Sequence, residues 1–371
     1  MAAALEPFRI EVPDATLEDL RARLDRTRLP NQIEGIGWAQ GTERDYLRDL
    51  LDHWRGAYDW RRVEAELRSY DNVRVVVDGQ PLHALHARSA SPDAVPLLLV
   101  HGWPGSVVEF LDALPALTET FHVIAPSLPG YGFSGPTTER GWHPRRIAGA
   151  CVELLDALGY DRYGLQGGDW GSVVTSNVAD LVPERVIGLH LNFVVVPRPD
   201  DATEPTPEEA EALATLAAWR RDGVGYQEIQ GTRPQSLGYG LEDSPAGLAG
   251  WIAEKFRAWS GGDDAALASF RPDRLLDNIT LYWVTGTATS STRLYWEMRQ
   301  VGRSALPQQR IEVPTGIACY PDEVTRFPRR WVETRYRVTH WVEQPRGGHF
   351  AAMQVPDLFV DDVRAFFATL H

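Results

Sequence analysis

Apolar positions in the first ninety residues follow a helical spacing and then change to a strand spacing. Three leucines in residues 14–24 recur at intervals of three and four behind a polar start, and they predict a helix. Comparable spacings predict helices from about residue 42 and over residues 60–67. The period then changes to two, and the pair Asp78 and Gly79 is a strong hairpin signal. We expect residues 1–90 to form a helical arm that wraps the main domain and leads into its first antiparallel strands.

From residue 91 the pattern alternates between apolar strands and amphipathic helices. Residues 95–100 form a continuous apolar run, which is typical of a central parallel strand covered on both faces. Further strands are predicted over residues 122–125, 163–166 and 186–193, and helices over residues 107–117 and 147–158. This alternation favours an α/β fold with a mostly parallel central sheet.

Between residues 197 and 305 the alternation stops. Prolines and acidic residues make a linker-like start, and helical patterns follow over residues 208–221, 246–259 and 275–283. We predict that this insertion is a helical lid over the carboxyl ends of the strands. The strand pattern then resumes and ends in a helix. The predicted organisation is an N-terminal arm (1–90), a first core part (91–196), the lid (197–305) and a second core part (306–371).

Composition and charge narrow the classes of partner. A formal net charge of -14 argues against binding to nucleic acid and to an anionic membrane surface. No apolar run has spanning length, and residues 1–7 lack the features of a signal peptide. Cys151 and Cys319 are expected to be free thiols in a reducing compartment. We therefore expect a soluble, cytoplasmic protein with no nucleic-acid or membrane partner, and the sequence leaves a homodimer open.

The candidate chemistry centres on Asp169, which lies between a predicted strand and a predicted helix. The surrounding pattern Gly-x-Asp-x-Gly matches a nucleophile elbow, with aspartate where serine is more familiar. Such a sharp turn leaves no room for side chains beside the nucleophile, and Gly167 and Gly171 meet that need. The turn would hold the carboxylate at a helix N-terminus, whose partial positive charge favours an anion. Taken alone, the same pattern also fits an aspartate that caps a helix after a glycine turn.

An acid and a histidine follow Asp169 in the order that this kind of site requires. His349 stands out among the ten histidines because two glycines precede it and a final helix follows. His101 is expected to brace its own loop instead of transferring protons. For the acid that orients His349 we prefer Glu323, and the adjacent Asp322 remains an alternative.

The segment from His101 to Ser106 supplies the last part of the predicted site. In hydrolases of this architecture, one oxyanion-hole amide comes from the loop after an early strand and the other from the residue after the nucleophile. These are the backbone N–H groups of Trp103 and Trp170. Their rings either wall the pocket or pack in the core.

Three motifs together carry a family resemblance: His101-Gly-Trp-Pro-Gly-Ser106, Gly167-Gly-Asp-Trp-Gly-Ser172 and Gly347-Gly-His-Phe-Ala-Ala352. They resemble epoxide hydrolases of the α/β-hydrolase superfamily, in the microsomal-type branch. The region before residue 90 resembles the N-terminal domain of these enzymes. Membrane-bound members begin with an anchor helix, so this chain is more similar to their soluble bacterial relatives. The resemblance implies a small-molecule epoxide as substrate and requires no metal or organic cofactor.

The resemblance also implies a two-step mechanism. Two lid tyrosines, matched here by Tyr226 and Tyr295, hydrogen-bond the epoxide oxygen while Asp169 attacks carbon. Tyr239 and Tyr282 also lie in the lid segment and are expected to pack. His349 then activates water, which hydrolyses the resulting alkyl ester to a vicinal diol.

Other readings of the same residues predict different functions. A haloalkane dehalogenase also uses an aspartate nucleophile, but its halide-binding asparagine has no match in the segment from His101. A serine esterase is disfavoured by aspartate at the elbow. A non-catalytic hydrolase-fold binding protein would not require the acid, the histidine and Asp169 together. The identity of the epoxide, and a role in detoxification or natural-product biosynthesis, stay open.

Overall fold

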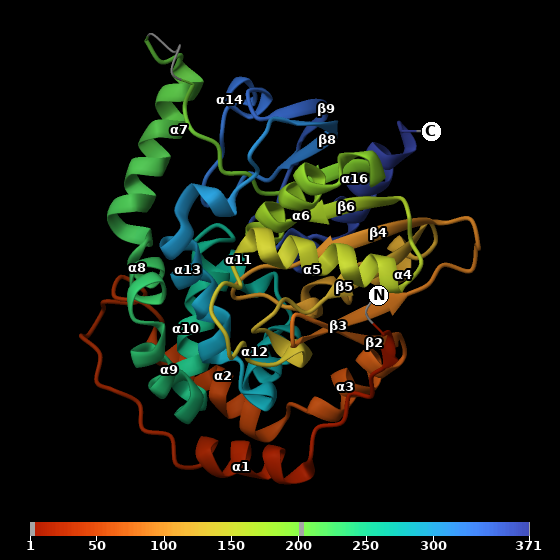
Figure 1. Ribbon diagram of the computed structural model, residues 1–371. Coiled ribbons are helices and arrows are strands. Elements are labelled where there is room, and N and C mark those ends of the chain that lie inside the picture. The colour runs from red at the N-terminus through yellow and green to blue at the C-terminus, as the bar shows by residue number, and fades with distance from the viewer. Residues whose placement is uncertain (1–3, 200–203, 371) are drawn as a thin grey trace.

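The computed structural model describes residues 4–199 and 204–370, which fold around one twisted sheet (Figure 1). Outside this description lie the first three residues tested for a signal peptide and part of the linker-like start of the lid. Its strands are β1 (Glu6–Pro7), β2 (Asp71–Val77), β3 (Gln80–Ala87), β4 (Val95–Val100), β5 (Phe121–Pro126), β6 (Tyr163–Gly167), β7 (Val186–Leu191), β8 (Ile311–Cys319) and β9 (Tyr336–Glu343).

In the described residues these strands form a single sheet in the order β1-β2-β3-β5-β4-β6-β7-β8-β9. The first four in this order pair antiparallel, and the pairs from β5 to β9 are parallel. The hairpin between β2 and β3 turns at Asp78 and Gly79, whose φ angles of 49° and 78° are those of a two-residue hairpin turn. The predicted mostly parallel α/β sheet is confirmed.

The helices divide into those of the arm, the core and the lid. The arm contains α1 (Asp14–Leu24), α2 (Arg44–Gly56) and α3 (Trp60–Arg68). The core contains α4 (Leu114–Leu117), α5 (Pro144–Ala157), α6 (Asp169–Leu181), α14 (Arg329–Glu333), α15 (Ala351–Gln354) and α16 (Pro356–Ala368), with the short helices η1 (Val107–Phe110), η2 (Gly132–Ser134) and η3 (Pro183–Arg185). The lid contains α7 (Pro207–Ala218), α8 (Gly225–Thr232), α9 (Pro234–Asp243), α10 (Pro245–Ala258), α11 (Asp264–Ala268), α12 (Pro272–Thr285) and α13 (Ala288–Val301), with η4 (Trp219–Gly223) and η5 (Gly302–Ala305).

Two helical expectations differ from the structure. The continuous helix predicted over residues 107–117 is two short helices, η1 and α4. Pro115 explains the break, because proline lacks the N–H that a helix interior needs and its ring clashes with the preceding turn. The lid holds α8, α9, α11 and α13 in addition to the three predicted helices. The proline at the start of α9 and the left-handed Gly286 before α13 divide this segment into shorter helices than its apolar pattern indicates.

Helices cover both faces of the sheet, and two glycines of β6 let them approach closely. A Cβ on Gly164 would lie 2.5 Å from the Phe367 ring of α16. A Cβ on Gly167 would lie 2.7 Å from the Thr175 hydroxyl of α6. Because residues three apart on a strand point to opposite faces, α6 and α16 sandwich the sheet at its centre, as Figure 1 shows.

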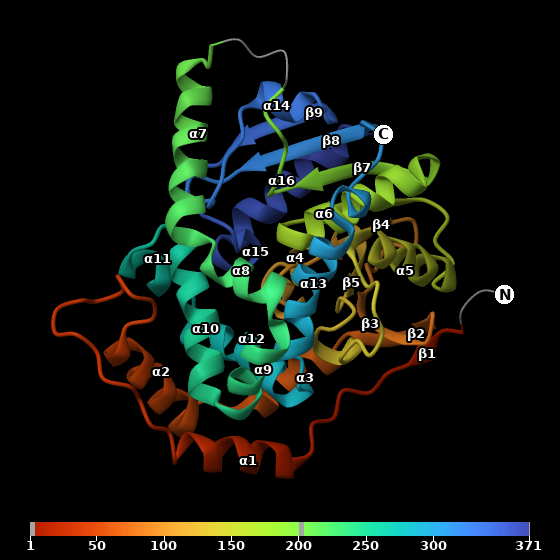
Figure 2. The ribbon, with the colours of Figure 1, turned by 60° about the vertical axis from the view of Figure 1, so that its left-hand side comes forward.

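The arm lies chiefly against the lid, whereas the sequence indicated only that it wraps the main domain. Helices α1 and α2 pack on α10, and α3 packs on α12. Figure 2 shows the red and orange arm passing beneath the green lid helices. No helix in the described parts of the chain combines the length and the apolar character that crossing a bilayer requires.

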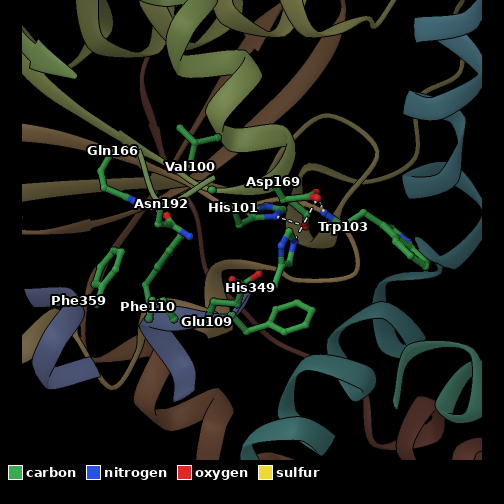
Figure 3. A pocket seen from close by; sticks show the side chains of 15 residues that line it. Val100, His101, Trp103, Glu109, Phe110, Gln166, Asp169, Asn192, His349 and Phe359 are labelled. Atoms are coloured by element: carbon green, nitrogen blue, oxygen red, sulfur yellow. Dashed lines mark hydrogen bonds and ion pairs between the residues drawn. The ribbon is translucent and has the colours of Figure 1, made fainter. Parts of the chain in front are cut away.

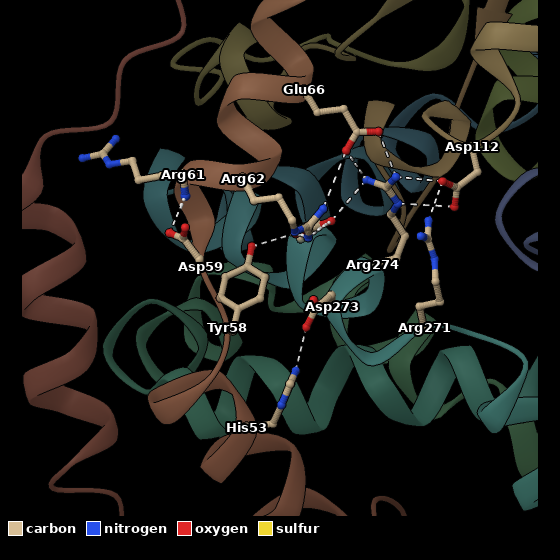
Figure 4. Close-up of polar contacts among 11 residues, drawn as sticks. His53, Tyr58, Asp59, Arg61, Arg62, Glu66, Asp112, Arg271, Asp273 and Arg274 are labelled. Carbon is tan, nitrogen blue, oxygen red and sulfur yellow. Dashed lines mark hydrogen bonds and ion pairs between the residues drawn. The ribbon is translucent and has the colours of Figure 1, made fainter.

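A buried network of charged side chains joins the arm to α12 (Figure 4). Asp277, fully buried on α12, accepts hydrogen bonds from the Arg62 guanidinium at 2.6 Å and from the Tyr58 hydroxyl at 2.9 Å. On the same helix, the buried Arg274 contacts Glu66 of α3 at 2.9 Å and Asp277 at 3.2 Å. The arm is therefore an electrostatic support for the lid helix above the core.

Candidate active site

Asp169 stands on a strained turn between β6 and α6. Its φ of 49° lies in the left-handed region, which costs a non-glycine residue roughly 1–3 kcal/mol. A Cβ on Gly171 would lie 1.9 Å from the Val100 carbonyl oxygen, and one on Gly167 would lie 2.4 Å from the Gly171 carbonyl oxygen. Only glycine fits both positions, so the turn can bring the start of α6 against β4 and present Asp169 above the sheet.

The Asp169 carboxylate has a different neighbour at each oxygen. The Trp103 backbone N–H, in the loop after β4, donates to Oδ1 at 2.8 Å. His349 Nε2, in the loop after β9, lies 3.2 Å from Oδ2. A Cβ on Gly102 would lie 2.1 Å from Oδ1, so the loop after β4 needs glycine beside the carboxylate. Figure 3 shows Asp169 between Trp103 and His349.

Glu323, in the loop after β8, contacts the other side of the imidazole. His349 Nδ1 donates to Glu323 Oε1 at 2.8 Å, and the two side chains are only 3% and 4% exposed. Asp322 is exposed, and its backbone bridges to Gly348. The structure thus brings Glu323, and not the adjacent Asp322, to His349.

The two carboxylates determine the charge of His349. Burial by itself would lower the pKa of the imidazole, but Glu323 and Asp169 outweigh it and raise this pKa to about 10. At neutral pH the imidazole is therefore protonated and lies between two anions. His101, by contrast, donates from Nδ1 to the Gly102 carbonyl oxygen and accepts from the Leu128 N–H, so it braces its loop as expected.

Tyr226 of α8 and Tyr295 of α13 meet above Asp169 within an aromatic enclosure. Their ring centroids are 5.7 Å apart. The Tyr226 ring stacks on Trp103 at 5.3 Å, and the Tyr295 ring meets Trp170 edge-on at 5.0 Å. Burial raises the pKa of both phenols well above its usual value, and the Asp169 charge adds to this. Both phenols therefore keep their protons at neutral pH and can donate hydrogen bonds.

The other two lid tyrosines are not part of this enclosure. Tyr239 is 71% exposed. The Tyr282 hydroxyl donates to the Gly105 carbonyl oxygen at 2.6 Å, so it braces the loop after β4. The structure therefore separates the two lid tyrosines nearest Asp169 from those with other contacts.

Sequence reasoning missed Asn278 of α12, which also braces that loop. Its side-chain amide donates to the Pro104 carbonyl oxygen at 2.8 Å, and its Oδ1 accepts from the Ser106 hydroxyl at 2.7 Å. These partners are more than 170 positions away in the chain. An asparagine within a helical pattern carries no signal for such contacts.

Sequence reasoning also missed Glu109 and Gln166, which lie behind Asp169. Glu109 of η1 is 9% exposed, and burial raises the pKa of its carboxyl group to about 8. Gln166 of β6 is 1% exposed and donates to Asn192 Oδ1 at 2.7 Å. A glutamine in an otherwise apolar central strand was the one signal available. The described residues contain no group of three or more His, Cys, Asp or Glu side chains that could hold a metal ion.

Comparisons with known proteins agree on one family. Residues 5–110 match the family model described as the epoxide hydrolase N terminus, and residues 95–227 match the α/β-hydrolase fold. The chain is 45% identical to a candidate epoxide hydrolase of Stigmatella aurantiaca, over 99% of this chain and 86% of that protein. It is 36% identical to epoxide hydrolase 1 of Sus scrofa, over 99% of this chain and 89% of that protein.

Solved structures give the same result. The juvenile hormone epoxide hydrolase of the silkworm Bombyx mori superposes with a TM-score of 0.92 at 30% identity, over 99% of this chain and 95% of that one. The epoxide hydrolase of Aspergillus niger gives a TM-score of 0.88 at 29% identity, over 100% of this chain and 98% of that one. The resemblance read from the three motifs is confirmed: the chain belongs to the epoxide hydrolase family of the α/β-hydrolase fold, in its microsomal-type branch.

Proposed function

We propose that the protein is an epoxide hydrolase that converts an epoxide to a vicinal diol through an ester on Asp169. One observation carries the assignment of roles. Asp169, His349 and Glu323 lie in one line of contacts of 3.2 Å and 2.8 Å, beneath two protonated tyrosines. This arrangement supplies a nucleophile, a base with its orienting acid, and proton donors for the leaving oxygen.

In the first step, Asp169 attacks one epoxide carbon. Its Oδ1 is held by the Trp103 amide, so we assign the attack to Oδ2, which leaves Oδ1 as the carbonyl oxygen of the ester. The carbon–oxygen bond of the epoxide breaks, and Tyr226 and Tyr295 donate hydrogen bonds and a proton to the oxygen that leaves.

In the second step, a water molecule attacks the ester carbonyl carbon while His349 Nε2 takes its proton. Ester formation removes the negative charge of Asp169, one of the two carboxylates that raise the pKa of His349. The pKa of the imidazole therefore falls after the first step, and His349 can become the neutral base that the second step needs. We assign the oxyanion hole to the Trp103 and Trp170 amides.

An apolar or aryl epoxide suits the aromatic walls of the enclosure. A related protein is named for juvenile hormone, which makes a lipophilic epoxide a reasonable member of a test panel. A haloalkane dehalogenase would use the same nucleophile, but the two protonated tyrosines above Asp169 suit a leaving alkoxide better than a halide.

Three further proposals concern the whole protein. The division into arm, two core parts and lid remains our proposal for its domains. Cys151 and Cys319 form no disulfide, which supports a reducing, cytoplasmic location that cell fractionation would test. A homodimer remains to be tested by light scattering during size-exclusion chromatography.

The variant His349→Gln tests the proposed chemistry. It should form the Asp169 ester and fail to hydrolyse it, because a carboxylate needs no base to attack. Intact-protein mass spectrometry should then show an adduct that weighs one whole epoxide, and peptide mapping should place it on Asp169. Control protein with both Asp169→Asn and His349→Gln should stay unmodified. An adduct at another residue, or no adduct across aryl and alkyl epoxides, would refute the proposal.

A further inference from the structure

A small internal cavity lies directly behind Asp169. It offers about 20 Å³ of volume to water. A single water needs roughly 10–15 Å³ on this scale, together with two to four polar partners. None of its lining residues belongs to the lid, and both Asp169 and His349 border it. In Figure 3 the cavity residues Gln166 and Asn192 lie on one side of Asp169, and the blue-green lid helices lie on the other, beyond Trp103.

The cavity has an unused hydrogen-bond acceptor in its wall. The Gln166 amide nitrogen donates to Asn192 Oδ1, while Gln166 Oε1 is buried and has no partner among the described residues. A buried amide oxygen without a partner costs about 1–3 kcal/mol. Since Gln166 lines a cavity large enough for water, a bound water would remove that cost.

Glu109 supplies a second polar group on the cavity wall. Figure 3 shows its carboxyl group pointing toward His349. A Cβ on Gly105 would lie 1.3 Å from Glu109 Oε1, so the missing side chain at Gly105 leaves the space that this carboxyl group occupies. Burial raises the pKa of Glu109 to about 8, with a further contribution from the Asp169 charge against the opposing effect of His349. Glu109 is therefore protonated at neutral pH, and it can donate as well as accept a hydrogen bond.

We propose that this cavity is the binding site of the hydrolytic water, and that Glu109 and Gln166 are its positioning residues. The inference rests on the proposed function and adds the place from which water attacks. The epoxide would occupy the lid side of Asp169, under the two tyrosines, and the water the core side. Water could then stay bound throughout ester formation without competing with the epoxide for space.

The hydrolytic step balances with these groups alone. The water oxygen forms a bond to the Asp169 carbonyl carbon, and one water proton passes to His349 Nε2. The tetrahedral intermediate then breaks its bond to the substrate oxygen, which takes that proton and leaves as a hydroxyl group of the diol. The remaining water proton is released, and the Asp169 carboxylate is regenerated with one oxygen from water. Glu109 and Gln166 keep their protons throughout, because they only orient the water.

Single-turnover kinetics with styrene oxide separates this proposal from a general effect on stability. Gln166→Leu and Glu109→Leu each remove a partner of the water and keep roughly the volume of the side chain. Both should slow ester hydrolysis about 10- to 100-fold, because misplacing a reacting group by about 1 Å has effects of that size. Ester formation should keep its wild-type rate, so the adduct on Asp169 should accumulate with His349 intact. The conservative variant Glu109→Gln retains a neutral donor and acceptor and should restore most of the hydrolysis rate.

Tyr163→Phe is the matched control. Tyr163 lies on β6 with Gln166, is fully buried, and its hydroxyl group has no partner in the described chain, but it does not line the cavity. Both steps should keep their wild-type rates in this variant.

Other outcomes would overturn the proposal in distinguishable ways. Wild-type hydrolysis rates in both leucine variants, or a loss confined to ester formation, would overturn the water site and leave the proposed function standing. Absence of an adduct even in His349→Gln would remove the proposed function and this inference together. A high-resolution crystal structure gives a check that needs no variant: it should contain a water within hydrogen-bond distance of Gln166 Oε1, and a dry cavity would overturn the proposal.

Discussion

The Trp103 backbone amide and the Asp169 carboxylate, 66 positions apart in the sequence, are joined by a hydrogen bond of 2.8 Å. This contact fixes which carboxylate oxygen faces the loop after β4 and which faces His349. It depends on two backbone features: the left-handed turn at Asp169, and glycine at position 102.

Gly102→Ala should abolish ester formation while the protein stays folded. The new methyl group would lie 2.1 Å from Asp169 Oδ1, so the carboxylate or the loop has to move. Loss of an oxyanion-hole type of contact costs about 10²–10³-fold in rate. Stopped-flow measurement of ester formation is the test. Gly79→Ala, in the exposed hairpin turn, has free space around its Cβ and is a control for the cost of alanine at a left-handed glycine.

Tyr226→Phe and Tyr295→Phe should each slow ester formation about 10²- to 10⁴-fold, the range expected for loss of a positioned proton donor. The rings would remain in the aromatic enclosure, so unfolding midpoints should change little. Tyr239→Phe, at a position that is 71% exposed, should leave the rate unchanged. A normal single-turnover rate in Tyr295→Phe would remove that residue from the proposed mechanism.

Glu323→Gln should impair ester hydrolysis, and Asp322→Asn should not. Glu323 is the acid that accepts the His349 Nδ1–H bond, whereas the Asp322 side chain is exposed. The reversed result, with hydrolysis lost only in Asp322→Asn, would show that the imidazole takes a different orientation in the working enzyme. Rates of ester decay by intact-protein mass spectrometry distinguish the two cases.

The stabilising effect of His349 should disappear in alkaline solution. The imidazole has a pKa of about 10 in the folded protein against 6.5 as the ordinary value, so the folded state binds its proton more tightly. The resulting stability is fully present below about pH 6.5 and is lost as the pH rises through about 10. Urea unfolding of the wild type and of His349→Gln should therefore show a difference in free energy that shrinks between these pH values. A constant difference across this range would contradict the raised pKa.

Arg274→Met should destabilise the protein by about 3–5 kcal/mol, because it leaves Asp277 buried with one of its two arginine partners missing. The double variant with Asp277→Leu should recover part of the loss, since a buried apolar pair replaces a buried ion pair. Chemical unfolding measures both. If the double variant is the sum of two independent losses, the network does not act as a unit.

Local geometry explains how much could be predicted from the sequence. The period of apolar residues located most strands and helices, because burial of one face imposes that period. Breaks within a helical pattern were less visible: Pro115 interrupts the helix expected over residues 107–117, and Gly286 separates α12 from α13. Those breaks follow from single residues, which a periodic pattern averages away.

The sequence by itself determined the elbow at Asp169, because glycines at 167 and 171 and the strand-to-helix order are local properties of the chain. Only the tertiary structure decided that Glu323 and not Asp322 reaches His349, and that Glu109 lies in the same buried space. Adjacent side chains in a loop point in different directions, and packing selects which one enters the core. Contacts between residues a hundred or more positions apart depend on how helices settle on the sheet, and no spacing along the chain records that arrangement.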